Sequence, residues 1–229
     1  MTTVAIHQPQ YLPWLPYLAK VEQADVFVWL DDTQYEKNGL QNRNMVRVGD
    51  DARWLTVPVR ARLGEPLNEV RVADDTWRRK HVDTLRQSYP SSRAQVDALA
   101  EALAGAGDRL VEVSLASTRW LLEALGVTTR CVLASTLGVP GRGVERLVSI
   151  CEALGADTYL SGNGARAYQQ ASDFSARGIA LMYQRYESQT YGQARPGFVA
   201  DLSGLDLVLC AREDARASFV RGLREPVAG

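Results

Sequence analysis

Residues 4–32 begin with Val4-Ala5-Ile6-His7-Gln8-Pro9 and end with Val26-Phe27-Val28-Trp29-Leu30-Asp31-Asp32. Each end carries a short apolar run rich in β-branched residues, which is typical of a buried strand in a parallel sheet. Between the two runs, apolar residues recur at helical spacing over residues 15–21. A strand, a helix and a strand in about 30 residues form a βαβ unit, whose two strands lie parallel.

The rest of the chain continues this pattern after one interruption. Further strands are expected at 129–134, 157–160 and 179–183, and further helices at 77–89, 91–104, 114–125 and 143–154. Residues 35–73 differ, because the turns at Asn38-Gly39 and Gly49-Asp50-Asp51 bracket apolar runs that predict a β-hairpin. The predicted fold class is α/β, with an open, mostly parallel Rossmann-like sheet, helices on both faces and an inserted β-hairpin. We expect one domain over 1–229, with 212–229 as a peripheral helical tail.

Composition limits the classes of partner. The chain is 46% hydrophobic and 23% charged, with a formal net charge of −1, which argues against a nucleic-acid or anionic-membrane partner. No signal peptide or apolar run of about 20 residues is present, so we expect a cytoplasmic protein. Cys131, Cys151 and Cys210 each lie in an apolar run, which favours buried thiols over disulfides or metal ligands.

The loop after the first strand carries the strongest candidate for chemistry. Ligands of open α/β sheets bind where the strands end, and His7 follows the first strand directly. A histidine there suits general-base catalysis, although local hydrogen bonding alone would also explain it. Gln8 and Tyr11 are candidate substrate-binding groups beside it, with core packing as the other interpretation of the tyrosine.

Two carboxylates follow the second strand. Asp31 is expected to orient His7, or to hold an amine or a divalent cation, and Asp32 to contact substrate; turn capping is the alternative for both. No cluster of histidine, cysteine and acidic residues has metal-ligand spacing, so no metal site is predicted.

Three further segments are candidates for the site. Gln41, Asn42 and Arg43 form a polar run that suits either a ligand clamp or a turn. Ser161, Gly162, Asn163, Gly164 and Arg166 form a glycine-rich turn that suits an anion-binding loop or a tight strand-to-helix connection. Tyr191 and Gln193 lie in an irregular segment that is expected to cover the site. His81, on a basic helix, is a catalytic candidate with a surface position as the alternative.

Together these segments carry a resemblance to a known family. The opening Ile6-His7-Gln8-Pro9-Gln10-Tyr11-Leu12-Pro13-Trp14 resembles the start of the WbqC-like family. The run 23–32, the segment 41–44, the turn 161–165, and Tyr191 and Gln193 are similar to that family too. The resemblance implies a role in bacterial clusters for surface polysaccharides or specialised products, with glycine or aminoacyl transfer as the suggested activity. This chain has Gln10 where the family commonly has asparagine.

The leading hypothesis is an acyl- or aminoacyltransferase that forms an amide, glycyl transfer included, with His7 deprotonating the attacking amine. Asn42, Arg43 and residues 161–164 would hold a carbonyl oxygen or a phosphate of the donor. The donor would be a thioester of coenzyme A or of an acyl or peptidyl carrier protein, the acceptor a small molecule, and no intrinsic cofactor is expected. Two alternatives stay open: a nucleotidylyltransferase-like enzyme, and a non-catalytic module that binds a sugar or a carrier protein.

Overall fold

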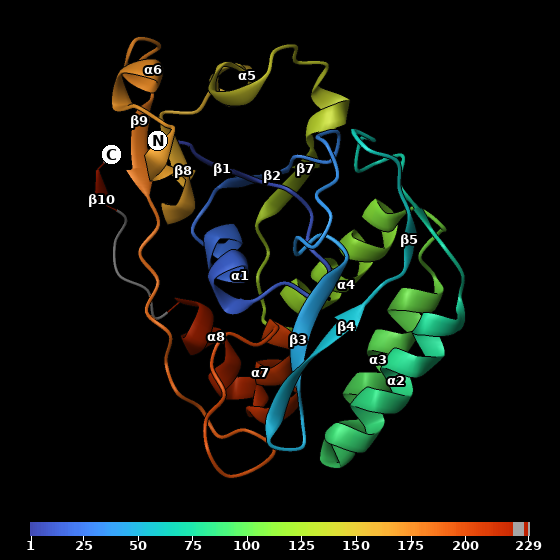
Figure 1. Ribbon diagram of the computed structural model, residues 1–229. Coiled ribbons are helices and arrows are strands. Elements are labelled where there is room, and N and C mark those ends of the chain that lie inside the picture. The colour runs from blue at the N-terminus through green and yellow to red at the C-terminus, as the bar shows by residue number, and fades with distance from the viewer. Residues whose placement is uncertain (222–226, 229) are drawn as a thin grey trace.

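The computed structural model describes residues 1–221 and 227–228 (Figure 1). Six strands form the main sheet: β1 (Thr3–His7), β2 (Val26–Trp29), β7 (Arg130–Leu133), β8 (Thr158–Ser161), β9 (Ala180–Tyr183) and β10 (Val227–Ala228). Their spatial order is β10-β9-β8-β1-β2-β7, and all neighbours are parallel except β10, which pairs antiparallel with β9. The predicted α/β class and mostly parallel sheet are confirmed.

The strand order creates a crevice at the carboxyl end of the sheet. The chain passes from β1 outward through β2 to β7, and then returns to the other side of β1 to place β8 and β9. Between β1 and β8 the loops therefore leave in opposite directions, which is the point where open α/β sheets bind ligands.

Helices cover both faces of this sheet, and each face has its own apolar core. The α-helices are α1 (Leu15–Glu22), α2 (Thr76–Ser88), α3 (Arg93–Ala104), α4 (Leu110–Ala124), α5 (Gly143–Ala153), α6 (Ala171–Ser175), α7 (Gly204–Cys210) and α8 (Glu213–Arg221). Ala5 and Phe27 pack with apolar residues of α1, α4 and α7, whereas Val4 and Val28 pack with those of α5 and α6. The alternation follows from the two-residue period of a strand. Figure 1 shows α5 and α1 on opposite sides of the sheet.

The predicted β-hairpin is confirmed, although its strands begin and end at other residues than the apolar runs. β3 (Arg43–Val48) and β4 (Asp51–Thr56) pair antiparallel, and a two-stranded ribbon of β5 (Val59–Arg60) and β6 (Arg71–Val72) follows. Residues 54–59 do not form one continuous strand, because Pro58, which has no backbone N–H to donate to a ladder, separates β4 from β5.

Other boundaries also differ from the expectations. The helix expected from residue 114 begins at Leu110, where the Glu112 carboxylate accepts a hydrogen bond from the Arg109 N–H. Three short 3₁₀ helices were not predicted: η1 (Pro90–Ser92), η2 (Ala134–Leu137) and η3 (Asn163–Ala167). The tail over 212–229 contains α8 and also the unexpected strand β10; its residues 222–226 and 229 lie outside the described part. Within that part, no helix combines the length and apolarity that a membrane span requires.

Candidate functional site

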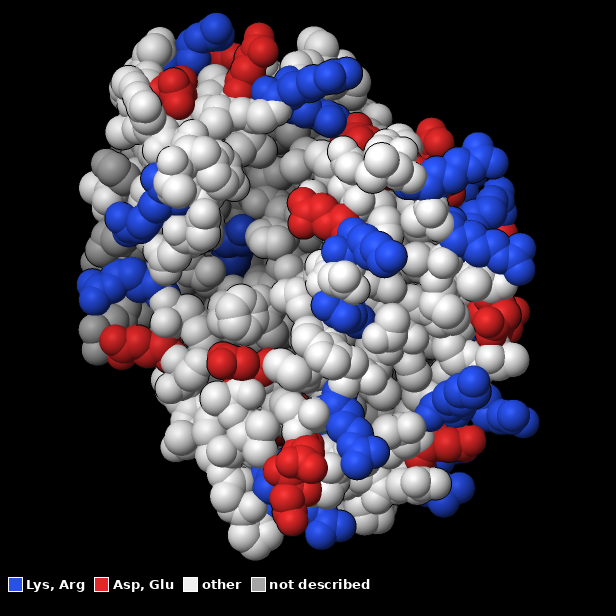
Figure 2. Space-filling view, viewed as in Figure 1, with Lys and Arg blue, Asp and Glu red and all other residues white. Residues whose placement is uncertain are grey.

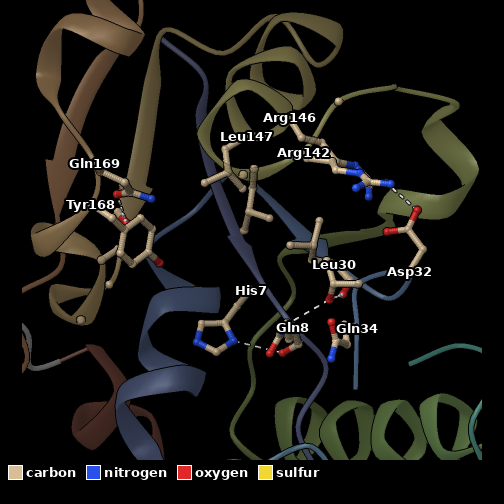
Figure 3. A pocket seen from close by; sticks show the side chains of 18 of the residues that line it. His7, Gln8, Leu30, Asp32, Gln34, Arg142, Arg146, Leu147, Tyr168 and Gln169 are labelled. Atoms are coloured by element: carbon tan, nitrogen blue, oxygen red, sulfur yellow. Dashed lines mark hydrogen bonds and ion pairs between the residues drawn. The ribbon is translucent and has the colours of Figure 1, made fainter. Parts of the chain in front are cut away.

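A pocket of about 850 Å³ opens at the carboxyl ends of β1 and β8, at the crevice created by the strand order. Its size is in the range of about 300–1,000 Å³ that is usual for small-molecule sites. Six residues singled out from the sequence line it: His7, Gln8, Asp32, Ser161, Gly162 and Gly164. Figure 2 shows a hollow on the viewed face with acidic and basic side chains around it. Figure 3 shows His7 and Gln8 in the lower part of the view, with Arg142 and Arg146 across the pocket from them.

His7 is held in one tautomer by its own loop. Its Nδ1 lies 3.1 Å from the Gln8 carbonyl oxygen, and because a carbonyl can only accept, Nδ1 carries the hydrogen. Nε2 then keeps its lone pair, with no hydrogen-bond partner among the described residues. Burial, with the nearby positive charge of Lys20 as the second cause, lowers the pKa of His7 to about 3 despite the opposing bond to Gln8. The imidazole is therefore neutral near pH 7, with the Nε2 lone pair as its acceptor.

Gln8 is fixed by a chain of amide hydrogen bonds. Its Nε2 donates to Thr33 Oγ1 at 3.2 Å, and its Oε1 accepts from Gln41 Nε2 at 2.9 Å. Gln41 Oε1 in turn accepts from the Glu36 N–H at 2.8 Å. Gln41 is thus a positioning residue for Gln8 and does not itself line the pocket.

The two aspartates after β2 point in different directions. Asp31 is buried and accepts from the Ser135 N–H at 3.0 Å and the Ser135 hydroxyl at 2.7 Å. The expectation that Asp31 orients His7 is wrong, because β7 lies beside β2 and brings Ser135 to this carboxylate. Asp32 does line the pocket, where its Oδ2 pairs with the Arg146 guanidinium (Figure 3).

Ser161, Gly162 and Gly164 form the opposite wall at the end of β8. Ser161 is buried and donates a hydrogen bond to Gln169 Oε1 at 2.7 Å. The Tyr168 ring, about two-thirds exposed, lines the same wall. The turn contains a short 3₁₀ helix, Asn163–Ala167, that borders the pocket; anion binding by this turn stays a prediction. Asn163 and Arg166 are outside the lining; the Arg166 guanidinium lies over the Tyr183 ring, 4.2 Å from its centroid.

Several predicted site residues lie elsewhere. His81 is buried, not on the surface, and its Nδ1 lies 3.0 Å from the buried Tyr11 hydroxyl. Burial lowers the pKa of His81 to about 4. Asn42 donates to the Val57 carbonyl at 2.8 Å, and Arg43 lies over the Trp54 ring. These contacts hold the hairpin and α2, not the pocket.

Tyr191 and Gln193 belong to a second buried network. Tyr191 donates to Asp206 at 2.8 Å, and Tyr89 donates to the same carboxylate at 2.6 Å. Gln193 Oε1 accepts from Arg47 at 2.8 Å. The segment therefore packs on the hairpin instead of covering the pocket.

Lys20 was not singled out from the sequence. It lies on α1 with 3% of its surface exposed, lines the pocket, and donates a hydrogen bond to the Ile6 carbonyl at 3.2 Å. The only local signal is its spacing of three residues from Tyr17, which places both on the helix face that contacts the sheet.

Comparison with known proteins identifies the family. A model of the WbqC-like protein family matches residues 8–218. The chain belongs to the WbqC-like protein family. One curated relative, Uncharacterized protein Rv1507c of Mycobacterium tuberculosis (strain ATCC 25618 / H37Rv), is 31% identical over 217 residues, which cover 91% of this chain and 93% of the relative. No solved structure matches the chain. In this WbqC-like protein the match begins at Gln8, which borders the pocket directly after His7.

Proposed function

We propose that this WbqC-like protein is an acyl- or aminoacyltransferase that joins an activated acyl group to an amine as an amide. The observation that carries the proposal is the neutral His7 imidazole, which lines a pocket of ligand size; its Nδ1–H is held by Gln8, and its Nε2 has no partner among the described residues. A general base needs this combination of a fixed ring and an accessible acceptor atom.

The proposed reaction has two steps, attack of the amine on the thioester and release of the thiol. The nitrogen of a neutral amine forms a bond to the thioester carbonyl carbon while His7 Nε2 accepts one of the amine's protons. The C–S bond then breaks, and the imidazolium returns the proton to the departing thiolate, so the products are an amide and a free thiol. Because the surroundings disfavour the imidazolium, the proton is passed on and not retained by His7.

The groups that hold the acyl carbonyl differ from those expected at first. Asn42 and Arg43 lie in the hairpin, so the proposed holders are the residues of the expected set that border the pocket at the end of β8, Ser161 and Gly162. The donor is proposed to be a thioester of coenzyme A or of a carrier protein, with glycyl transfer as one case. The reaction is proposed to serve polysaccharide or specialised-metabolite biosynthesis, a role that the resemblance to the WbqC-like family supports.

The test is a transfer assay on the purified protein. Acyl and aminoacyl thioesters of coenzyme A and of a loaded carrier protein are incubated with small amines, and mass spectrometry detects the amide while a thiol reagent follows the released thiol. We expect His7→Ala to lower kcat by about 10²–10⁴-fold. Turnover that is unchanged in His7→Ala would remove this base from the reaction, and absence of amide with every donor would contradict acyl transfer.

One observation favours a second candidate, a nucleotidylyltransferase-like enzyme. Arg142 and Arg146, at the start of α5, line the same crevice between β1 and β8, and arginine pairs well with phosphate oxygens. This candidate predicts that ATP or CTP with magnesium raises the melting temperature and that pyrophosphate is released. Nucleotides without effect on melting would count against it.

A further inference from the structure

Lys20 is a buried cation without a counter-charge in the described part of the chain. Lys20 is 3% exposed, and its one hydrogen bond among the described residues is to the neutral Ile6 carbonyl oxygen. An ammonium group has three N–H donors, so two of them are left for a ligand. Burial lowers the pKa of Lys20 to about 7, because the charged form has lost its water and gained no carboxylate.

Space for a ligand group lies directly beside this ammonium. A Cβ atom built on Gly162 would have the Lys20 Nζ, at 3.8 Å, as its one neighbour within 4 Å. The absence of a side chain at residue 162 therefore leaves the pocket open next to Nζ, at the end of β8.

The charges that line the pocket are unequal. Lys20, Arg142 and Arg146 are its cations, and Asp32 and Glu36 are its carboxylates, so three positive groups face two negative ones. Asp32 is already paired with Arg146, and Glu36 is exposed. A ligand that brings a negative group to Lys20 would supply the missing counter-charge and restore the stability of the ammonium form.

We propose that the pocket binds its ligand through an oxyanion, a phosphate or a carboxylate, and that Lys20 is the buried counter-charge that recognises it. The inference deepens the proposed function, since the oxyanion would belong to the donor or to the acceptor of the transfer. A phosphate would come from a coenzyme A, phosphopantetheine or nucleotide donor, and a carboxylate from an amino-acid substrate.

Calorimetric titration at constant ionic strength tests the proposal with two probes. Pyrophosphate represents the phosphate source, and N-acetylglycine represents the carboxylate source without an amine. We expect one of them to bind the wild type and Lys20→Met to weaken that binding by about tenfold or more, as for loss of a hydrogen bond to a charged group. Lys80→Met removes an exposed lysine on α2 and should leave the affinity unchanged. Failure of both probes to bind, or equal binding by Lys20→Met, would overturn the proposal.

A second measurement uses the wild-type protein, so it does not depend on whether Lys20→Met folds. The chain has three lysines, Lys20, Lys37 and Lys80, so reductive methylation followed by peptide mass spectrometry reports each one separately. The bound probe should slow methylation of Lys20 and leave the two exposed lysines unaffected; equal rates at Lys20 with and without probe would contradict the proposal. Transfer activity without oxyanion binding would remove this inference alone, whereas binding without any transfer would remove the proposed function alone.

Discussion

The Nζ atom of Lys20 donates a hydrogen bond to the carbonyl oxygen of Ile6 at 3.2 Å, and this contact joins α1 to β1 next to His7. The buried ammonium is one cause of the lowered pKa of His7. Lys20 therefore influences the charge of His7, and both side chains line the pocket at the crevice between β1 and β8.

Replacement of His7 should affect chemistry and not folding. Among the described residues, the His7 side chain has one hydrogen bond, to its neighbour's backbone. The free energy of unfolding of His7→Ala should therefore lie within about 1 kcal/mol of the wild-type value. Its transfer rate should fall by about 10²–10⁴-fold. His81→Ala is the matched control: it removes a buried partner of Tyr11 and should lower the free energy of unfolding by about 1–3 kcal/mol. A His7→Ala protein that unfolds like His81→Ala would indicate a structural role for His7.

The stability of the protein should depend on Lys20 and on pH. The pKa of Lys20 is about 7 in the folded chain, below its ordinary 10.5, so the unfolded chain binds more protons between these two values. The free energy of unfolding therefore increases as pH rises above about 7, because Lys20 loses its proton in the folded chain first. Lys20→Met removes this gain and should be more stable than the wild type at pH 7 and below by roughly 1–4 kcal/mol.

Urea unfolding of both proteins between about pH 6 and pH 8.5 measures that difference. The range stays below the pH at which buried cysteines and tyrosines with raised pKa values contribute in the opposite direction. A stability difference that stays constant over the range would contradict the lowered pKa of Lys20.

Tyr191 should matter for stability and not for ligand binding. Its hydroxyl donates to the fully buried Asp206 at 2.8 Å, so Tyr191→Phe removes a donor from a buried carboxylate. We expect a loss of about 1–3 kcal/mol in the free energy of unfolding, measured with urea. Tyr168→Phe changes a ring that is 65% exposed and should cost less than about 0.5 kcal/mol. A large loss of activity in Tyr191→Phe without loss of stability would place Tyr191 in the site after all.

Removal of the Asp32 charge should strengthen oxyanion binding. Asp32 neutralises Arg146 in the pocket wall, so Asp32→Asn leaves that guanidinium available to a ligand. The affinity for the probe that binds the wild type should rise by roughly two- to tenfold at low salt, and the gain should shrink as ionic strength increases. Asp31→Asn is the comparison, because Asp31 is bonded to Ser135 outside the pocket. Equal effects of Asp32→Asn and Asp31→Asn on affinity would contradict the assignment of Asp32 alone to the pocket wall.

Local sequence patterns were sufficient for the framework of the fold. The apolar runs at β1 and β2, and the helical spacing between them, are short-range signals that do not depend on the rest of the chain. The same patterns placed His7, Asp32 and the turn at 161–164 at strand ends, where the pocket lies. Boundaries were less well predicted where a single residue decides them, as Pro58 does between β4 and β5.

The sequence by itself thus determined the α/β class, the family and the loops that border the site, because these follow from periodicity and from one compact motif. Only the tertiary structure decided which side chains meet. The position of β8 beside β1 brings Gly162 to Lys20, and that of β7 beside β2 takes Asp31 to Ser135. The neighbours of a strand are set by packing between residues more than 100 positions apart in these cases, and no local pattern carries that information.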